Sequence, residues 1–278
     1  MPRRKPWIRT TLAIAMLAAC LIGCASTTSR METAAALDRV LGGPHRPEDE
    51  RARDQYRHPK ETLLFFGLRP EMTVLELSPG AGWYTRVIAP LVRELGRLLA
   101  GLGPLVESNP NSVRQHENFR ALLAAWPGLL DRVEIVSFDP GRSPITAPAS
   151  VDLVLTFRSL HGWMARDGAA AAIADVYRVL KPGGVFGVID HRGNAALPQD
   201  PRSRNGYVNQ DYAIRLIEDA GFRIVATSEI NANPRDTKDY PGGVWTLPPT
   251  LAGGENDREK YLAIGESDRF TLKFVKPR

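Results

Sequence analysis

A short apolar run that breaks into a glycine turn is the feature of this sequence that most limits its fold. Residues 74–77 form the run, which is typical of a buried parallel strand. The turn that follows contains Gly80 and Gly82, and a helix pattern begins at Trp83. Glycine lets the main chain turn sharply and leaves room where a Cβ would collide with a ligand. A strand, a glycine turn and a helix in this order bring the backbone close to a nucleotide-like ligand.

Strand and helix patterns alternate along the rest of the chain. The expected strands are residues 74–77, 97–100, 133–138, 151–157, 185–190, 222–230 and 268–276. The expected helices between them are residues 83–95, 111–126, 167–180 and 207–220, and shorter helices precede the first strand at 31–41, from 47, and at 60–68. This alternation predicts an α/β fold with one doubly wound, mostly parallel seven-stranded sheet and extra N-terminal helices. The stretches 140–150 and 231–250 are expected to be loops.

The charge of the chain does not indicate a nucleic-acid partner. The formal net charge is +5, but four basic residues lie in the first ten positions, and without them it is +1. The high isoelectric point of about 9.3 therefore reflects the N-terminus and not a basic binding surface.

The N-terminus has the pattern of an export signal. A basic start is followed by an apolar stretch, residues 12–23, which is shorter than the ~20 residues that span a bilayer. Leu21-Ile22-Gly23-Cys24 resembles the lipobox of bacterial lipoproteins, whose cysteine is lipidated. Cys20 also fits that pattern, but the polar tether begins only after Cys24. We therefore expect a signal peptide at 1–23, with an uncleaved membrane anchor as the alternative.

The remaining chain is expected to divide into two parts. Residues 24–44 would hold the lipidated Cys24, a tether and a short helix, and residues 45–278 would form the folded domain. The resemblance implies a periplasm-facing lipoprotein of the cell envelope, attached to a membrane by its lipid. Ser26 is not the Asp associated with inner-membrane retention, which favours the outer membrane. With Cys20 and Cys24 as the only cysteines, the domain has no disulfide and no thiolate nucleophile.

Two motifs resemble a known enzyme family. Glu76-Leu-Ser-Pro-Gly-Ala-Gly82 is similar to the first motif of class I S-adenosylmethionine-dependent methyltransferases, with Ser78 in place of the first glycine. Leu180-Lys-Pro-Gly-Gly184 is similar to the helix stop before that family's fifth strand. The segments 157–163 and 190–192 also resemble a group of predicted bacterial methyltransferases. The resemblance covers residues 45–278 and implies a Rossmann-like methyltransferase fold, an antiparallel end hairpin, S-adenosylmethionine as cofactor and a small-molecule acceptor.

The resemblance also implies which residues contact the cofactor. They are Glu76, Ser78, Gly80, Gly82, Tyr84, Asp139, Phe157 and Arg158. Asp139 would meet the adenine amino group, although an Asp before Pro140 is equally explained by a turn. The family carries a ribose-binding acid at the tip of the second strand, whereas residues 101–104 contain none and Glu107 lies several positions on. Ribose hydroxyls without that acceptor would forfeit ~1–3 kcal/mol.

Candidate catalytic residues follow the fourth and fifth strands. His161 and the pair Asp190 and His191 fall where strand ends place ligand-binding groups. Neutral imidazole takes a proton from a hydroxyl, amine or thiol near pH 7, so we expect His161 to be the base, assisted by Asp190 or His191. Two histidines and a carboxylate also suit a divalent metal. Methyl transfer needs no metal, and we expect none.

Three functions compete on the sequence alone. A lipid-anchored methyltransferase is favoured by both motifs. A non-catalytic envelope binding protein on the same fold is favoured by the missing ribose acid and by the export signal, because the methyl donor is made in the cytoplasm. A nicotinamide-dependent oxidoreductase is weaker, because Gly80-x-Gly82-x-x-Thr85 lacks the third glycine and no Tyr-x-x-x-Lys occurs. The resemblance implies that helices before the first strand cover the cofactor. Asp54, Tyr56 and Arg57 could line that cover, with a solvated helix face as the alternative for each. The sequence specifies neither the acceptor nor the oligomeric state.

Overall fold

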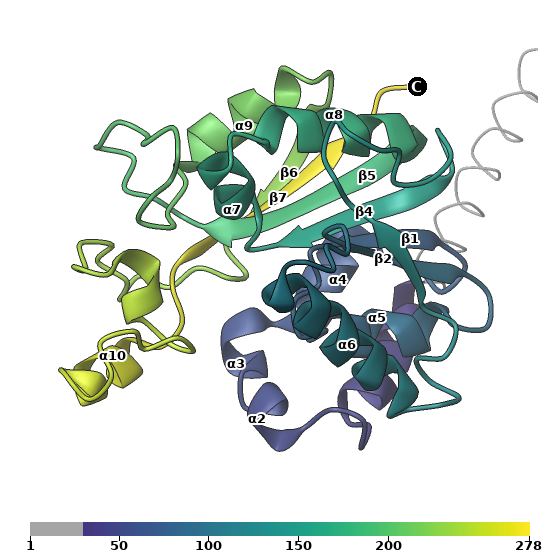
Figure 1. Ribbon diagram of the computed structural model, residues 1–278, viewed down its shortest axis with the longest axis horizontal. Helices are drawn as coiled ribbons and strands as arrows, with labels where there is room; N and C mark the ends of the chain where they lie inside the picture. Colours follow the sequence, from purple (N-terminus) through teal and green to yellow (C-terminus); the bar gives the residue numbers. More distant parts are fainter. Residues whose placement is uncertain (1–29) are drawn as a thin grey trace, which may run out of the picture.

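A single seven-stranded sheet crosses the molecule (Figure 1). The computed structural model describes residues 30–278 of the chain. The strand order is β3-β2-β1-β4-β5-β7-β6, and every pairing is parallel except those of β7 with β5 and β6. The strands are β1 (Thr73–Leu77), β2 (Arg97–Leu102), β3 (Glu134–Ser137), β4 (Val151–Phe157), β5 (Leu180–His191), β6 (Arg223–Ser228) and β7 (Arg269–Val275). The predicted α/β fold, its mostly parallel sheet and the antiparallel end hairpin are confirmed.

Helices cover both faces of the sheet (Figure 1). One face carries α4 (Pro59–Phe66), α5 (Thr85–Val92) and α6 (Pro110–Ala124), and the other carries α7 (Leu160–Ala165), α8 (Ala169–Val179) and α9 (Gln210–Glu218). Residues 30–41 are helical and are followed by the short helices α2 (Glu48–Arg51) and α3 (Asp54–Arg57). The predicted N-terminal helices are thereby confirmed. No helix within residues 30–278 is both long and apolar enough to cross a bilayer.

The core consists of two apolar clusters, one on each face of the sheet. The period of two in β1 sends Leu75 and Leu77 into the cluster beneath α8 and α9. Val74 faces the other cluster, which packs against α4 and α5. Glu76 shares the face of Val74, so the one charged residue of β1 points toward the start of α5.

Some expected boundaries were wrong. Helix α5 begins at Thr85 and not at Trp83, because the glycine turn continues through Trp83 and Tyr84. Helix α8 ends at Val179, but the chain enters β5 at once, since Leu180 is already extended and pairs with Val151. The expected loop at 231–250 contains a 3-10 turn, Gly243–Thr246. Two helices were not predicted: α7, which follows β4 directly, and α10 (Arg258–Ile264) in the long connection after β6.

The register of the sheet aligns the strand ends that matter for function. Leu77 of β1 lies opposite Thr156 of β4, and Phe157 lies opposite Ile189 of β5. The Arg158 backbone N–H donates to the Ile189 carbonyl at 2.7 Å, which continues the pairing one residue further. The glycine turn, the end of β4 and the Asp190–His191 pair therefore meet at one edge of the sheet. The expected signal peptide at 1–23 and the candidate lipidation site Cys24 lie outside the described residues.

Candidate active site

Two cavities open at the carboxyl ends of the parallel strands. The first, here called the glycine-turn cavity, has a volume of about 570 Å³ and is lined by Ser78, Gly103, Pro104, Gln115, Phe138, Asp139, Pro140, Arg142, Trp163, Arg166 and Gly168. The second, here called the histidine cavity, has a volume of about 200 Å³ and is lined by Arg158, His161, His191, Val244, Trp245, Pro248, Pro249 and Thr250. Helix α7 contributes Trp163 to the first cavity and His161 to the second, so the two share a wall.

The two glycines of the turn have different roles. Ser78, Gly80 and Gly82 all adopt left-handed backbone conformations, with φ of 54°, 59° and 79°. A Cβ on Gly82 would lie 2.2 Å from Leu122 Cδ2, so this glycine lets α6 pack against the turn. A Cβ on Gly80 would meet no atom within 4 Å. Gly82 is therefore required for packing, and Gly80 leaves open space beside the turn for a ligand.

The glycine-turn cavity has the size and chemistry for an adenosyl group. Its volume lies within the roughly 300–1,000 Å³ typical of small-molecule sites. Phe138 and Trp163 supply aromatic walls, and the indole N–H of Trp163 has no hydrogen-bond partner within residues 30–278. Asp139 and Gln115 add polar side chains. The residues present therefore fit the cofactor that the sequence implied.

No acid takes the place expected for ribose binding. The chain leaves β2 through Gly103 and Pro104, which line the cavity, and Glu107 is exposed on the loop beyond them. Gln115 is the polar residue that α6 presents to the same cavity. Sequence reasoning missed Gln115, because this residue lies 13 positions beyond Leu102, the end of β2, and the pattern of its helix gives no sign of which face meets the ligand.

Glu76 is buried beneath the turn. Its carboxylate accepts a hydrogen bond from Thr85 Oγ1 at 2.6 Å, which joins β1 to the first residue of α5. Burial raises the pKa of Glu76 to about 7, and the Thr85 hydrogen bond opposes this only in part. Near neutral pH this carboxyl is therefore poised between its charged and neutral forms.

The aromatic residues after the turn do not fill the cavity. The Trp83 ring lies between the guanidinium groups of Arg46 and Arg57, at 5.0 and 4.7 Å, and its indole N–H donates to the Glu50 carbonyl. Tyr84 stacks on Phe157 with ring centroids 3.5 Å apart. Phe157 and Tyr84, both expected to contact the cofactor, thus form a pair that links the turn to the end of β4.

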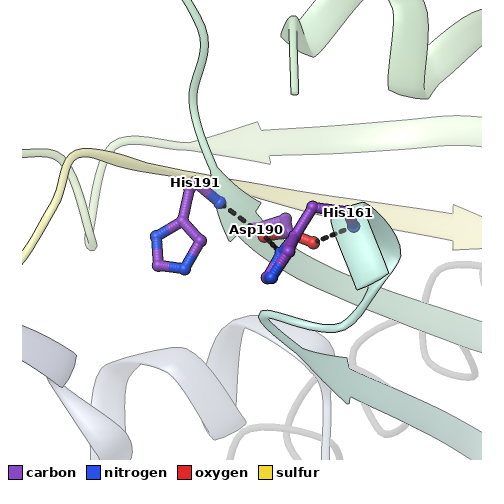
Figure 2. Close-up of side chains that lie close together, drawn as sticks. All are labelled: His161, Asp190 and His191. Carbon is purple, nitrogen blue, oxygen red and sulfur yellow. Dashed lines mark hydrogen bonds and ion pairs between the residues drawn. The ribbon is translucent and has the colours of Figure 1, made fainter. Parts of the chain in front are cut away.

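His161 and Asp190 form a hydrogen-bonded pair at the edge of the histidine cavity. Figure 2 shows Asp190 between the two histidines. The fully buried Asp190 accepts from the His161 backbone N–H at 2.9 Å and from the His191 backbone N–H at 2.7 Å, and His161 Nδ1 lies 2.8 Å from Asp190 Oδ1. An ionised carboxylate only accepts hydrogen bonds, so His161 Nδ1 carries the proton. His161 Nε2 is therefore left as a free acceptor.

The pKa values of the two histidines move in opposite directions. Burial acts to lower the pKa of His161, but the charge of Asp190 and its hydrogen bond outweigh burial and raise it above the ordinary 6.5. Burial lowers the pKa of His191 well below 6.5, so its ring is neutral. His191 Nδ1 hydrogen-bonds Ser267 Oγ at 2.5 Å, and the two imidazole centroids are 5.2 Å apart. The arrangement gives His161 the environment of a base and His191 that of a neutral neighbour.

The same three residues are a candidate metal centre. His161, Asp190 and His191 offer potential ligand atoms that all lie within 4.8 Å of one another. Two backbone N–H groups and the His161 ring already donate to Asp190, however, and His191 Nδ1 is bonded to Ser267. A metal ion bound to Asp190 would compete with these hydrogen bonds for the carboxylate oxygens. The hydrogen bonds present favour the base over the metal centre.

A group of arginines extends from the histidine cavity toward α3. Glu266 accepts from Arg53 Nε at 2.7 Å, from Arg57 Nε at 3.1 Å and from Arg269 Nη1 at 3.0 Å. Arg57 and Arg269 are almost fully buried. Burial lowers the pKa of Arg57 to about 9, and burial also lowers the pKa of Arg158. Several guanidinium groups thus share one carboxylate beside the cavity.

The structure divides the residues expected in the site between the two cavities. Ser78 and Asp139 line the glycine-turn cavity, whereas Arg158, expected near the cofactor, lines the histidine cavity with His161 and His191. Of the expected cover residues, Arg57 joins the arginine group and Asp54 pairs with the buried Arg46. Sequence reasoning missed Glu266 and Trp245. A tryptophan within a glycine- and proline-rich loop is the signal that could have identified Trp245; Glu266 gives no such signal.

The central part of the chain matches a known family. Residues 75–188 match the family model described as "Methyltransferase domain". The matched stretch begins in β1 and ends in β5, so it contains the glycine turn, the end of β4 and His161. The match to a methyltransferase domain indicates an enzyme that uses S-adenosylmethionine, as predicted. No curated protein matches the chain.

Solved structures share the fold over most of the chain. A SAM dependent methyltransferase from Aquifex aeolicus is 19% identical, with 81% of this chain and 93% of that chain covered and a TM-score of 0.52. The [4+2]-cyclase SpnF is 19% identical, with 91% and 96% covered and a TM-score of 0.58. A putative sarcosine dimethylglycine methyltransferase from Galdieria sulphuraria is 16% identical, with 82% and 86% covered and a TM-score of 0.52. At such identities the similarity shows the fold alone, and one of the three is named for a different reaction.

Proposed function

We propose that this chain transfers a methyl group to a hydroxyl, amine or thiol of a small acceptor held in the histidine cavity. The observation that carries the proposal is the His161–Asp190 pair, which leaves a free imidazole nitrogen at the strand edge that also bears the glycine turn. A pair of this kind is what proton removal from an attacking nucleophile requires.

The cofactor would occupy the glycine-turn cavity. Ser78, Gly80 and Gly103 provide close backbone approach, and Asp139 provides an acceptor for the adenine amino group. When bound, S-adenosylmethionine supplies an electrophilic methyl group on a positively charged sulfur. The role of the protein is then to hold the acceptor in line with that methyl group and to remove the acceptor's proton.

His161 performs the proton transfer in this account. Its Nε2 accepts the proton that the acceptor's O–H, N–H or S–H group loses as that atom becomes methylated. The imidazolium that forms is stabilised by the Asp190 carboxylate at 2.8 Å from Nδ1. The two backbone N–H groups that hold Asp190 prevent its rotation, so the imidazole keeps both its tautomer and its direction.

Exchange of His161 tests this role. A His161→Asn variant should lose ~10²–10⁴-fold in turnover of S-adenosylmethionine to its demethylated product, measured with a panel of small phenols, amines and thiols. Calorimetric affinity for the demethylated product should stay within about twofold of wild type, because His161 does not line the glycine-turn cavity. An unchanged turnover rate in the variant would remove His161 from catalysis.

We also propose that the mature protein is a periplasm-facing lipoprotein attached to a membrane, the outer one in preference, through Cys24. The basic start, the short apolar stretch and the lipobox resemblance support this. Mass spectrometry of the mature N-terminus should find a diacylated or triacylated Cys24. A Cys24→Ala variant should remain unprocessed, whereas Cys20→Ala should be processed normally. Normal processing of Cys24→Ala, or blocked processing of Cys20→Ala, would contradict the assignment to Cys24.

A further inference from the structure

We propose that the acceptor is a small anion with an apolar body, whose negative group binds Arg158 while its nucleophilic atom faces His161. This inference names the substrate class for the function proposed above and rests on it. The observation behind it is that Arg158 lines the histidine cavity with His161 and His191. A guanidinium is well suited to bind a carboxylate or phosphoryl group through paired hydrogen bonds.

Arg158 has no anionic partner of its own. Its side chain makes no hydrogen bond or ion pair at bonding distance within residues 30–278, although it lies in the field of Glu266 and Asp190. Both of these carboxylates are already engaged. Glu266 binds three other arginines, and Asp190 is held by His161 and by the His191 backbone. Arg158 is thus the guanidinium of this group that is left for a ligand.

The charges around the cavity favour an anion. The four arginines of the group are Arg53, Arg57, Arg158 and Arg269, and the carboxylates among them are Glu266 and Asp190. With neutral histidines this leaves two more positive than negative charges in a largely buried region. One Nη2 nitrogen on each of Arg53 and Arg57 also lacks a hydrogen-bond partner within the described chain. Unpaired buried charge is costly, and an anionic ligand would relieve that cost.

The backbone at Arg158 is held in an uncommon conformation. Its φ is +58°, in the left-handed region that a long side chain seldom adopts. The bond from its N–H to the Ile189 carbonyl keeps it there, directly after β4. Non-glycine residues in this region cost of order 1–3 kcal/mol and cluster at ligand-binding sites. In this conformation Arg158 turns away from the line of β4 and lines the histidine cavity instead of continuing the strand.

The other walls of the cavity indicate the rest of the acceptor. Val244, Pro248 and Pro249 are apolar, and the Trp245 ring lies 6.2 Å from that of His161. A volume of about 200 Å³ admits a small molecule or the end of a larger one. An apolar body between Trp245 and the prolines would place its anionic end at Arg158 and leave His161 for the nucleophile.

Binding of simple probes tests this without cofactor or turnover. The full chain is titrated calorimetrically with benzoate, with phenylphosphonate and with the neutral isostere benzamide. We expect at least one of the two anions to bind ten or more times tighter than benzamide, which corresponds to about 1.4 kcal/mol. Preference for benzoate would indicate a carboxylate acceptor, and preference for phenylphosphonate would indicate a phosphoryl acceptor.

Variants of Arg158 identify the group responsible. Arg158→Gln should reduce the preference for the anion to less than threefold, and Arg158→Lys should keep part of it. Arg204→Gln is the matched control, because Arg204 is an exposed arginine paired with Asp200 and lines neither cavity; it should keep the full preference. Thermal unfolding checks each variant. If Arg158→Gln does not fold, a reduced anion preference in Arg158→Lys supports the proposal and an undiminished preference overturns it.

Three results would overturn the proposal. One is equal binding of both anions and benzamide, or no binding of either anion. Another is a preference that survives in Arg158→Gln. The third is a loss of affinity for S-adenosylhomocysteine in Arg158→Gln with the anion preference intact, because Arg158 would then serve the donor's own carboxylate. A wild-type titration with S-adenosylhomocysteine is run separately. If S-adenosylhomocysteine binds and the anions bind no better than benzamide, only this inference fails. If the anions bind and S-adenosylhomocysteine does not, the proposed methyl transfer fails instead.

Discussion

At the scale of single residues, Asp190 sets the orientation, the tautomer and the pKa of His161. Asp190 has no exposed surface and accepts three hydrogen bonds, two of them from the backbone. It therefore fixes both the direction and the tautomer of the imidazole. Burial alone would lower the pKa of His161, and it is the carboxylate that raises it. The pH dependence of the reaction should report this balance.

The rate of methyl transfer should rise with pH through the pKa of His161. The base must be unprotonated, and its pKa in the ligand-free protein lies above 6.5, so the acid limb of the kcat/KM profile should lie above pH 6.5. Asp190→Asn removes the charge that raises this pKa while burial remains, so the limb should move to lower pH. The variant should also lose ~10²-fold or more in kcat, because the imidazole tautomer is no longer fixed. An acid limb that stays at the same pH in Asp190→Asn would contradict the proposed effect of Asp190 on the pKa of His161.

Glu76 makes a second residue-scale prediction, on stability. Burial raises its pKa from 4.5 to about 7, so the folded chain holds this proton more tightly than the unfolded chain does. Stability from this group is therefore greatest below pH 4.5 and falls as pH rises toward 7, by a total of about 3 kcal/mol. Glu76→Gln keeps an acceptor for Thr85 without the charge. The unfolding temperature of Glu76→Gln should exceed that of wild type at pH 8 and match it near pH 4. Equal unfolding temperatures at pH 8 would show that the charged carboxylate of Glu76 does not destabilise the fold.

At the scale of elements, the two glycines of the turn serve different purposes: one allows helix packing, and the other leaves space for a ligand. Gly82 contacts α6, whereas Gly80 borders open space, although both have positive φ. Asn109 caps α6 by accepting from the Asn111 N–H at 3.0 Å. The cap fixes where α6 begins, and hence where Gln115 meets the cavity and Leu122 meets Gly82.

A matched pair of glycine variants tests this separation. Gly80→Ala and Gly183→Ala both introduce a Cβ at positive φ, and each should lower the free energy of unfolding by about 1–2 kcal/mol. Gly183 lies at the start of β5, beside Arg278 and away from both cavities. Only Gly80→Ala should weaken binding of S-adenosylhomocysteine, by about tenfold or more, in calorimetry. Equal affinities in the two variants would show that the cofactor does not approach Gly80.

Local patterns were enough to predict the elements that carry the site. The apolar runs of β1, β4 and β5 and the glycine turn are encoded over a few residues each, so their order and type were confirmed. Helix α7 was missed because it is short, contains Gly162 and follows a strand without a capping side chain. The helix α10 was missed because no apolar periodicity marks it; none of its residues is buried.

At the scale of the whole molecule, the site is covered by segments far apart in the chain. Arg57 of α3 meets Glu266, 209 residues away, and a Cβ on Gly265 would contact Tyr56. In Figure 1, α2, α3 and α10 all lie below the sheet. The sequence predicted an N-terminal cover but not its partner, because an ion pair between residues so far apart leaves no periodic or local signal. The division into two cavities was hidden for the same reason, since residues 244–250 form one wall of the second.

The methyl transfer proposed above requires the glycine-turn cavity to bind the adenosyl group of S-adenosylmethionine. The most direct measurement is a calorimetric titration of the purified protein with S-adenosylhomocysteine and, separately, with a nicotinamide dinucleotide. The account predicts one site per chain with micromolar affinity for the first ligand and no binding of the second. A folded protein that binds neither ligand, or that binds only the dinucleotide, would contradict it.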